Sequence, residues 1–329
     1  MTSLLERNAE EALRGIDAKP LASKAVLLTG ATGLIGVNLA AALTRSGARL
    51  TTPKRGVPQM GTYDFIIHAA GYAQPSRFLA DPMATIAVNT SMLADLIGRM
   101  KPDGRLLFLS TSEVYSGNPR SLHREEDIGA TNPASARACY IESKRCGEAI
   151  CHAACEDGKR ALIARVSSVY GPGVRAKDGR VMSQFIDSAI RDEEIALKDG
   201  GAARRVFLYV SDAVEMLLNI LVHGEGSVYN VGGPAMIQSA NVNGEVAIVQ
   251  LARKIGQIMG VPVKAPSAGG NAARSTGHGM PGAPAHVGLD LARYLREFPK
   301  DHWVSMDDGL RRTIEWHRQL AGAKAMVAA

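Results

Sequence analysis

Short continuous apolar runs, each followed by a helical pattern, organise the first half of the chain. The run at 25–29 ends in glycines, as expected of a strand buried on both faces. Similar runs at 64–68, 105–109 and 161–166 predict further strands, and 48–52 predicts a weaker one. This alternation predicts an α/β fold, a Rossmann-type doubly wound parallel sheet with helices on both faces.

Helical spacing of apolar residues fills the intervals between these strands. It predicts an amphipathic helix over 4–16, ahead of the first strand, and helices over 37–46 and 140–154. Few residues separate the strands at 48–52 and 64–68, where a doubly wound nucleotide fold ordinarily places a helix and a strand. We therefore expect the sheet to be abbreviated or irregular there.

The pattern loosens beyond Tyr170. The elements that it predicts there are helices over 181–191, 214–221 and 246–259, a strand over 228–231, and a mobile Gly/Ala/Pro/Ser-rich loop, either a lid or a solvated connection, over 267–284. The expected parts of the chain are an N-terminal helical extension (1–24), a Rossmann domain (25–170) to which 204–223 return, and a smaller, mainly substrate-binding C-terminal lobe (171–329).

The bulk composition excludes several classes of protein. The 329 residues are 46% hydrophobic and 21% charged, as in globular proteins, and no apolar run approaches the ~20 residues of a membrane-spanning helix. The net charge of +6 is spread over scattered lysines and arginines, so we expect no nucleic-acid binding. Charges at Glu6, Arg7, Glu10 and Glu11 stand where a secretory signal is apolar, so we expect a cytoplasmic protein.

The cysteines all fall within one stretch of the chain. They are Cys139, Cys146, Cys151 and Cys155. Their spacing lacks the tight Cys-x-x-Cys turn that is typical of metal sites. We therefore expect reduced, partly buried thiols, with no metal and no disulfide.

The first candidate site is the turn Gly30-Ala31-Thr32-Gly33-Leu34-Ile35-Gly36. A Gly-x-x-Gly-x-x-Gly turn between a strand and a helix lets the backbone approach a pyrophosphate and directs the helix N-terminus at it. The preceding strand and the following helix supply the context that this motif requires. The turn therefore predicts binding of a dinucleotide.

The second candidate site combines a tyrosine, a lysine and a hydroxyl. Tyr140 and Lys144 are four apart on a predicted helix, so the ammonium can lower the pKa of the phenol from its usual value near 10 and make it a general base. The run 110–112, Ser-Thr-Ser, directly follows a buried strand, where a hydroxyl can complete a proton relay at the carboxyl edge of the sheet.

Further runs make the chain similar to the extended short-chain dehydrogenases/reductases that act on nucleotide sugars. The runs are Ser-Thr-Ser-Glu-Val-Tyr at 110–115, Arg-Ala-Cys-Tyr at 137–140 continuing to Lys144-Arg145, Asp-Gly-Arg-Val at 178–181, and Arg205 with Phe207 and 209–212. Within that superfamily the chain most resembles the UDP-glucuronate decarboxylases, or UDP-xylose synthases, over nearly its whole length. The resemblance implies tightly bound NAD, a UDP-sugar substrate and a place in polysaccharide biosynthesis.

The resemblance also implies catalytic roles. Tyr140 would deprotonate the sugar 4-hydroxyl while hydride passes to NAD, with support from Lys144 and Thr111. The carboxylate of the resulting 4-keto sugar is beta to a ketone and would leave as carbon dioxide, after which the hydride returns. The residues of this chain that match the family positions acting in the loss of carbon dioxide are Ser112, Glu113 and Arg205.

Binding residues follow from the same resemblance. Those expected at the cofactor are Gly30, Thr32, Gly33, Leu34, Ile35, Gly36, Ala69, Ala70, Gly71, Tyr140 and Lys144. Those expected at the substrate are Gln74, Arg77, Ser168, Arg180, Val181 and Arg205.

Three departures from the family pattern affect these expectations. No acidic residue follows 48–52 to hold the adenosine ribose; Lys54 and Arg55 come instead, which makes NADP an alternative cofactor. Ser168 stands where the family commonly has an asparagine near the diphosphate. The stretch 68–75 stands where the decarboxylases usually have a Ser-Pro-rich loop, so we expect side chains other than those of the decarboxylases to face the sugar.

Other activities stay open. Nucleotide-sugar 4,6-dehydratases of the GDP-mannose type also use a Thr-Ser-Glu run, whereas dTDP-glucose dehydratases usually have aspartate where Ser112 stands. A 4-epimerase seldom needs an acid at the position of Glu113. A non-catalytic dinucleotide sensor is the alternative from another class, and the complete set of Thr111, Tyr140 and Lys144 disfavours it.

The family likeness also implies a homodimer. In it the helix over 140–154 packs against its symmetry mate as half of a four-helix bundle. The residues that suit such close packing, or equally an intramolecular core, are Cys146, Ala149, Ile150, Ala153 and Ala154.

Overall fold

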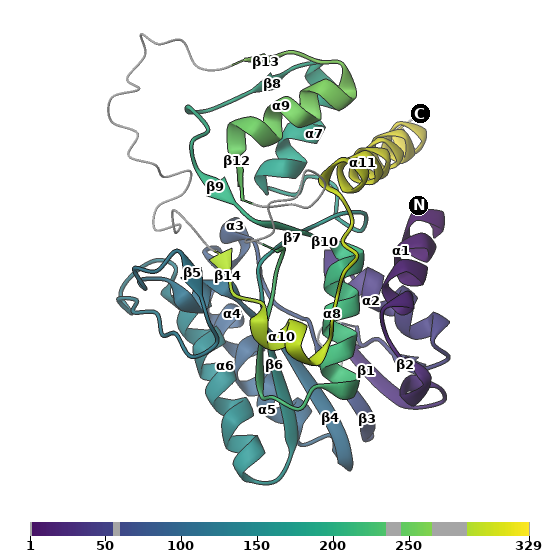
Figure 1. Ribbon diagram of the computed structural model, residues 1–329, viewed down its shortest axis with the longest axis vertical. Helices are drawn as coiled ribbons and strands as arrows, with labels where there is room; N and C mark the ends of the chain where they lie inside the picture. Colours follow the sequence, from purple (N-terminus) through teal and green to yellow (C-terminus); the bar gives the residue numbers. More distant parts are fainter. Residues whose placement is uncertain (1, 55–59, 235–244, 265–287, 329) are drawn as a thin grey trace.

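A six-stranded parallel sheet forms the centre of the computed structural model, which describes residues 2–54, 60–234, 245–264 and 288–328 (Figure 1). Its strand order is β11-β6-β4-β3-β1-β2. The strands are β1 (Ala25–Thr29), β2 (Arg49–Thr51), β3 (Tyr63–His68), β4 (Met100–Thr111), β6 (Arg160–Val166) and β11 (Val228–Val231). The predicted α/β fold with a doubly wound parallel sheet is confirmed.

The sheet is abbreviated on the side of β2. The strand β1 pairs with β2 on one side and with β3 on the other, so the chain crosses back over β1 after a single short strand. The loops that follow β1 and β3 therefore meet at the carboxyl edge, at the point where the strand order reverses. Ligands of open α/β sheets bind at such a point.

Two layers of helices cover the sheet (Figure 1). On one face lie α2 (Leu34–Arg45) and α8 (Val210–His223), with α1 (Thr2–Arg14) packed against both. On the other face lie α5 (Ser91–Ile97) and α6 (Ala138–Glu156), and α4 (Pro82–Asn89) packs against α6. Because α1 covers its outer side, α8 is buried along nearly its whole length.

Several elements differ in extent from the prediction. The helix expected over 37–46 begins at Leu34, because its first turn is already formed by the last residues of the glycine turn. The helix expected over 246–259 starts with the short strand β12 (Val246–Ala247) and continues as α9 (Ile248–Met259). The strand expected over 105–109 is longer at both ends, with a register shift against β3 near Tyr63.

The remaining elements lie mostly beyond the carboxyl end of the sheet (Figure 1). They include α7 (Val181–Asp192) and the strand pairs β7 (Ser168–Tyr170) with β10 (Phe207–Tyr209), β8 (Ile195–Ala196) with β13 (Val263–Lys264), and β9 (Arg204–Arg205) with β12. Shorter or peripheral elements are η1 (Lys19–Leu21), α3 (Pro75–Phe78), η2 (Ser112–Tyr115), β5 (Leu122–His123), β14 (Gly288–Leu289), α10 (Ala292–Glu297) and α11 (Met306–Ala328). The loop expected over 267–284 lies outside the described residues. None of the helices in the described ranges has the length and apolarity needed to cross a membrane.

Candidate functional site

The glycine turn leaves no room for side chains at two of its positions. Gly30 has φ of +73°, and a Cβ there would lie 2.5 Å from the backbone of Ala69. A Cβ at Gly36 would lie 2.0 Å from the carbonyl oxygen of Gly30. The N-cap of α2 is Gly33, and no side chain caps the helix. The free N–H groups of this helix end form the cradle that a pyrophosphate needs.

A buried histidine holds the neighbouring loop against this turn. The Nε2 of His68 lies 2.8 Å from the carbonyl oxygen of Val88, and its Nδ1 lies 2.7 Å from the hydroxyl of Thr29. Burial lowers the pKa of His68 to about 4, and the charge of Lys144 adds to this effect. The ring is therefore neutral, with its proton on Nε2. Thr29 in turn accepts the N–H of Ala70, which fixes the loop that follows β3.

The phenol of Tyr140 lies at the carboxyl end of β4. It shares a hydrogen bond with the hydroxyl of Thr111, and its ring stacks on Phe78 at 4.9 Å between centroids. Burial raises the pKa of Tyr140 above its usual value, and Glu113 adds to this effect, while Thr111 and Arg137 oppose it. The phenol is therefore neutral in this structure. The expected lowering of its pKa by the lysine does not appear here, because burial outweighs the favourable contacts.

Lys144 is buried one helical turn further along α6. Its ammonium donates to the carbonyl oxygen of Leu109 at 2.6 Å and lies 4.5 Å from the centre of the Phe108 ring. Burial lowers the pKa of Lys144 to about 7, whereas Glu148 acts in the opposite direction. The side chain therefore changes its charge near neutral pH.

A carboxylate between two arginines lies beside this pair. Both oxygens of Glu113 accept hydrogen bonds from Arg137, each at 2.6 Å. Glu113 also affects the pKa of Arg205. Burial lowers that pKa, and the charge of the Glu113 carboxylate opposes the lowering. Arg137 lies 5.3 Å from the centre of the Phe78 ring, which stacks on Tyr140, and the charges of Glu113 and Arg137 both act on the pKa of Tyr140. Ser112, half-buried, begins η2 between Thr111 and Glu113.

Two of the expected substrate residues meet at a buried aspartate. Gln74 donates to Asp178 at 2.7 Å, and Arg180 donates to both oxygens of the same carboxylate. Burial raises the pKa of Asp178, but the contacts with Arg180 outweigh that effect and lower it. The loop after β3 is thereby linked to the start of α7.

The other expected substrate residues are less closely connected. Arg77 and Ser168 are exposed, and Val181 is half-buried at the start of α7. Arg205 lies in β9, which pairs with β12 and so depends on a segment about forty residues further along the chain. Thr111, Glu113, Tyr140 and Arg205 are thus the predicted residues that the fold brings together most clearly.

Three residues at this site had no role assigned from the sequence. Arg137 holds Glu113, Phe78 covers the ring of Tyr140, and Arg175 donates to the carbonyl oxygen and hydroxyl of Thr32 in the glycine turn. Arg137 stands in the run at 137–140 that carried the family resemblance, which was a usable signal. Phe78 ends the four-residue helix α3 and Arg175 lies in an irregular stretch, and no local pattern marks either residue.

The end of β2 matches the sequence interpretation in part. Thr52 and Lys54 are exposed after this strand, and no acid stands there. Arg55, the second basic residue of the NADP alternative, lies outside the described residues.

Comparison with known proteins places these features in a family. The sequence model of the NAD dependent epimerase/dehydratase family matches residues 26–232. UDP-glucuronic acid decarboxylase 1 of Xenopus tropicalis is 33% identical over 264 residues, which are 72% of this chain and 61% of that protein. UDP-glucuronic acid decarboxylase 6 of Arabidopsis thaliana is 35% identical over 201 residues, 60% of this chain and 55% of that protein. The matched regions thus span little more than half the length of these relatives.

Solved structures show the same fold at lower identity. An NAD dependent NDP-hexosamine 5,6-dehydratase of tunicamycin biosynthesis superimposes with a TM-score of 0.72 at 20% identity, covering 91% of this chain and 100% of the other. UDP-glucose 4-epimerase of Thermotoga maritima gives a TM-score of 0.70 at 18% identity, covering 90% and 99% of the two chains.

Proposed function

Because the chain belongs to the NAD dependent epimerase/dehydratase family, we propose that it oxidises a nucleotide sugar transiently at carbon 4 and acts as a UDP-glucuronate decarboxylase. The observation that carries this proposal is the carboxylate of Glu113, paired with Arg137 and facing Arg205, beside the phenol of Tyr140. This arrangement suits chemistry at the carbon next to the oxidised one. The names of the curated relatives support the decarboxylase.

The chain offers residues that fit NAD. The cradle of Gly30, Gly33 and Gly36 would hold the pyrophosphate, because added Cβ atoms at two of them would collide with backbone. The buried Oδ1 of Asn89 has no hydrogen-bond partner within the described residues, and it lies with the ammonium of Lys144 near Gly71. These groups would face the nicotinamide end. When bound, NAD supplies the hydride acceptor for the oxidation.

In this proposal Tyr140 takes the proton of the sugar 4-hydroxyl. Thr111 shares a hydrogen bond with the phenol and keeps it directed at that proton. Lys144 holds a positive charge one helical turn away, which favours the phenolate as it forms. The hydrogen bonds of Thr29 with His68 and Ala70 hold the loop after β3 in place at this end of the sheet.

The carboxylate of the substrate would meet Arg205, since a guanidinium binds carboxylates through two parallel hydrogen bonds. Ser112 and Glu113 would relay a proton from water to carbon 5 as carbon dioxide leaves, so loss of this relay would also slow the loss of carbon dioxide. Arg180, held by Asp178, would lie toward the nucleotide.

Product masses test the activity directly. The protein is incubated with NAD+, and in parallel with NADP+, and with UDP-, GDP- and dTDP-sugars. We expect loss of carbon dioxide from UDP-glucuronate with NAD+. Loss of water from another sugar would indicate a dehydratase, an unchanged mass with altered retention an epimerase, and no product from any sugar would contradict the enzymatic proposal.

A 4,6-dehydratase is the second candidate, and the pairing of Glu113 with Arg137 favours it. Arg137 donates two short hydrogen bonds to Glu113, so the carboxylate is held as a hydrogen-bond acceptor, as a base that removes a proton from carbon 5 must be. A decarboxylase instead needs a proton at carbon 5 as carbon dioxide leaves. The sugar panel separates the two.

We also propose that the protein is a homodimer through α4 and α6. Leu79, Met83 and Ile86 are apolar and exposed there, Met83 to 73%. A hollow of about 610 Å³ lies beside them, lined in part by Cys139 and Cys146 of α6. An apolar surface of this kind favours a second copy of the chain, as the family resemblance implies. The cytoplasmic location stays a prediction from the sequence.

The residues expected to pack in the bundle divide between two faces of α6. Cys146, Ala149 and Ala153 are exposed, and Ile150 is half-buried. Ala154 is buried and belongs to the apolar cluster under the sheet, so it cannot take part in the contact. The helical period places it on the inward side.

Replacing Met83 by glutamate is expected to convert the dimer to a monomer, weakening association tenfold or more, by about 1.4 kcal/mol or more, because two charges would enter an apolar contact. Light scattering after size exclusion measures the mass. Ile128→Glu, at a position that is 81% exposed in another segment, is the matched control and should leave the mass unchanged. A monomeric wild-type protein would contradict the proposal.

A further inference from the structure

Three consecutive residues at the end of β4 contact three residues spaced by four on α6. The carbonyl oxygen of Leu109 accepts from Lys144, and the hydroxyl of Thr111 bonds to Tyr140. Between them, the hydroxyl of Ser110 donates to the carboxylate of Glu148 at 2.5 Å. Tyr140, Lys144 and Glu148 share one face of the helix, as their spacing requires. The contact of Glu148 with Ser110 has no part in the proposed reaction.

Arg165 holds the same carboxylate from the neighbouring strand. It is the register partner of Ser110 in the pairing of β4 with β6. Its Nη2 donates to Glu148 at 2.7 Å and its Nε at 3.0 Å. The two side chains are only 11% and 8% exposed. A buried ion pair of this kind contributes little net stability against its desolvation, but it strongly disfavours any arrangement that separates the charges.

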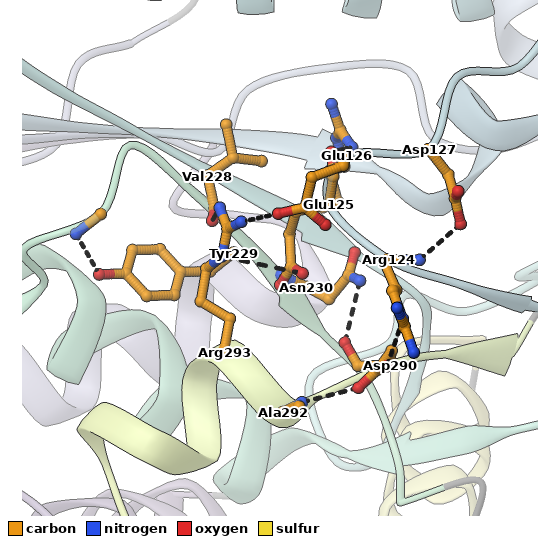
Figure 2. A network of polar contacts seen from close by, with 12 residues as sticks. Arg124, Glu125, Glu126, Asp127, Val228, Tyr229, Asn230, Asp290, Ala292 and Arg293 are labelled. Atoms are coloured by element: carbon orange, nitrogen blue, oxygen red, sulfur yellow. Dashed lines mark hydrogen bonds and ion pairs between the residues drawn. The ribbon is translucent and has the colours of Figure 1, made fainter.

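The guanidinium of Arg165 is itself fixed from its other side. Its Nη1 donates to the hydroxyl of Tyr115 and to the carbonyl oxygen of Glu125, both at 2.8 Å. The Tyr115 hydroxyl donates to Asn230, which also binds the carbonyl oxygens of His123 and Asp290. Figure 2 shows the outer part of this network, where Asn230, beside Tyr229 in β11, donates its backbone N–H to Glu125 and its side-chain amide to the carbonyl oxygen of Asp290. Arg165 therefore cannot turn away from Glu148 without breaking several contacts.

We propose that Glu148 is a positioning residue for Tyr140 and Lys144. Anchored by Ser110 and Arg165, it sets the position of α6 along β4 and supplies a negative charge one helical turn from the ammonium. This rests on the proposed roles of Tyr140 and Lys144 in the reaction.

The charges around Lys144 support a specific electrostatic effect. The titratable groups that act on it are Glu148 and Cys151 on the same helix, and its own charge acts on the neutral His68 of β3. Burial lowers the pKa of Lys144 to about 7, and Glu148 acts against that lowering. Loss of the carboxylate charge should therefore lower the pKa of Lys144 further. The lysine would then be uncharged at pH values where the wild-type lysine is still protonated.

Glu148→Gln tests this effect with almost unchanged shape. In protein labelled with ¹³C-lysine, the Lys144 signal, assigned by its absence in Lys144→Met, is titrated by NMR. We expect the midpoint to fall by about one pH unit. With an active substrate, kcat/KM should fall about tenfold above neutral pH and recover toward wild type below about pH 6. Melting curves check that the variants fold.

Three further variants complete the test. Glu156→Gln, exposed two turns further along α6, should change neither quantity. Glu148→Asp keeps the charge and should keep the wild-type midpoint while kcat falls, because the shorter side chain reaches Ser110 less well. Should Glu148→Gln not fold, Glu148→Gln/Arg165→Gln leaves no unpaired buried charge, and we expect a reduced kcat. An unmoved midpoint in Glu148→Gln, or a wild-type kcat in the double variant, would overturn the proposal. The NMR titration needs no turnover, so it is distinct from a failure of the proposed activity.

Discussion

Tyr140→Phe is expected to abolish turnover, with a loss of about 10²- to 10⁴-fold in kcat, because the proton of the sugar 4-hydroxyl then has no acceptor. The packing should survive. The ring stacks on Phe78 at an interplanar angle of 6°, and phenylalanine can keep that stack. The lost hydrogen bond to Thr111 should change the free energy of unfolding by only about 1 kcal/mol. Product formation from the active sugar measures the effect.

The matched control is Tyr63→Phe. Tyr63 is also buried, but it begins β3 at the opposite end of the sheet, and its hydroxyl donates to the carbonyl oxygen of Met60. We expect full activity and unchanged NAD+ affinity from this variant, measured by calorimetry. Full turnover by Tyr140→Phe would show that the phenol is not the base.

Glu113→Gln is expected to separate oxidation from the later chemistry. Tyr140 and Thr111 are intact in this variant, so oxidation at carbon 4 should continue, whereas the step at carbon 5 should slow about 10²-fold or more. The 4-keto sugar that still carries its carboxylate should then be released and be detected by its mass. This result would show that Glu113 acts in a step that follows the oxidation.

Glu142→Gln provides the control on the same helix as Tyr140. Glu142 pairs with Arg145 on the outer side of α6, and its loss should leave product formation unchanged. Because Glu113→Gln leaves the buried Arg137 facing a neutral amide, its melting temperature must be measured beside its rate. A folded Glu113→Gln with the wild-type product and rate would exclude a role for the carboxylate at carbon 5.

Local patterns in the sequence identified the parts of this site that depend on neighbouring residues. The run at 25–29 and the glycines after it form β1 and a turn where Gly36 has no space for a Cβ, since the chain folds back on itself within seven residues. Tyr140 and Lys144 share a helix face because the helical period puts them there. Such features need no knowledge of distant contacts.

Contacts between distant segments were not predictable in the same way. Arg137 donates to Glu113, which lies 24 residues earlier in the chain. Phe78 stacks on Tyr140, and Arg175 donates to Thr32, again between segments that are far apart in the sequence. Parallel strands need long crossovers, so residues that touch at their ends are far apart in the chain. Periodicity carries no information about such pairs.

The pKa values at the site show the same division. The spacing of the two residues predicts that Lys144 lowers the pKa of Tyr140. In the folded protein, burial instead raises the pKa of Tyr140, and it lowers the pKa of Lys144 to about 7. Spacing defines which charges are near one another, but desolvation depends on everything that excludes water from them.

The sequence by itself therefore determined the sheet, the cradle for a dinucleotide and the tyrosine and lysine on one helix face, because strand and helix periods are local properties of the backbone. Only the tertiary structure decided how Arg137 holds Glu113 near Arg205 and how Glu148 is bound by Ser110 and Arg165. These arrangements depend on strand order and burial, which arise when distant segments pack together and exclude water.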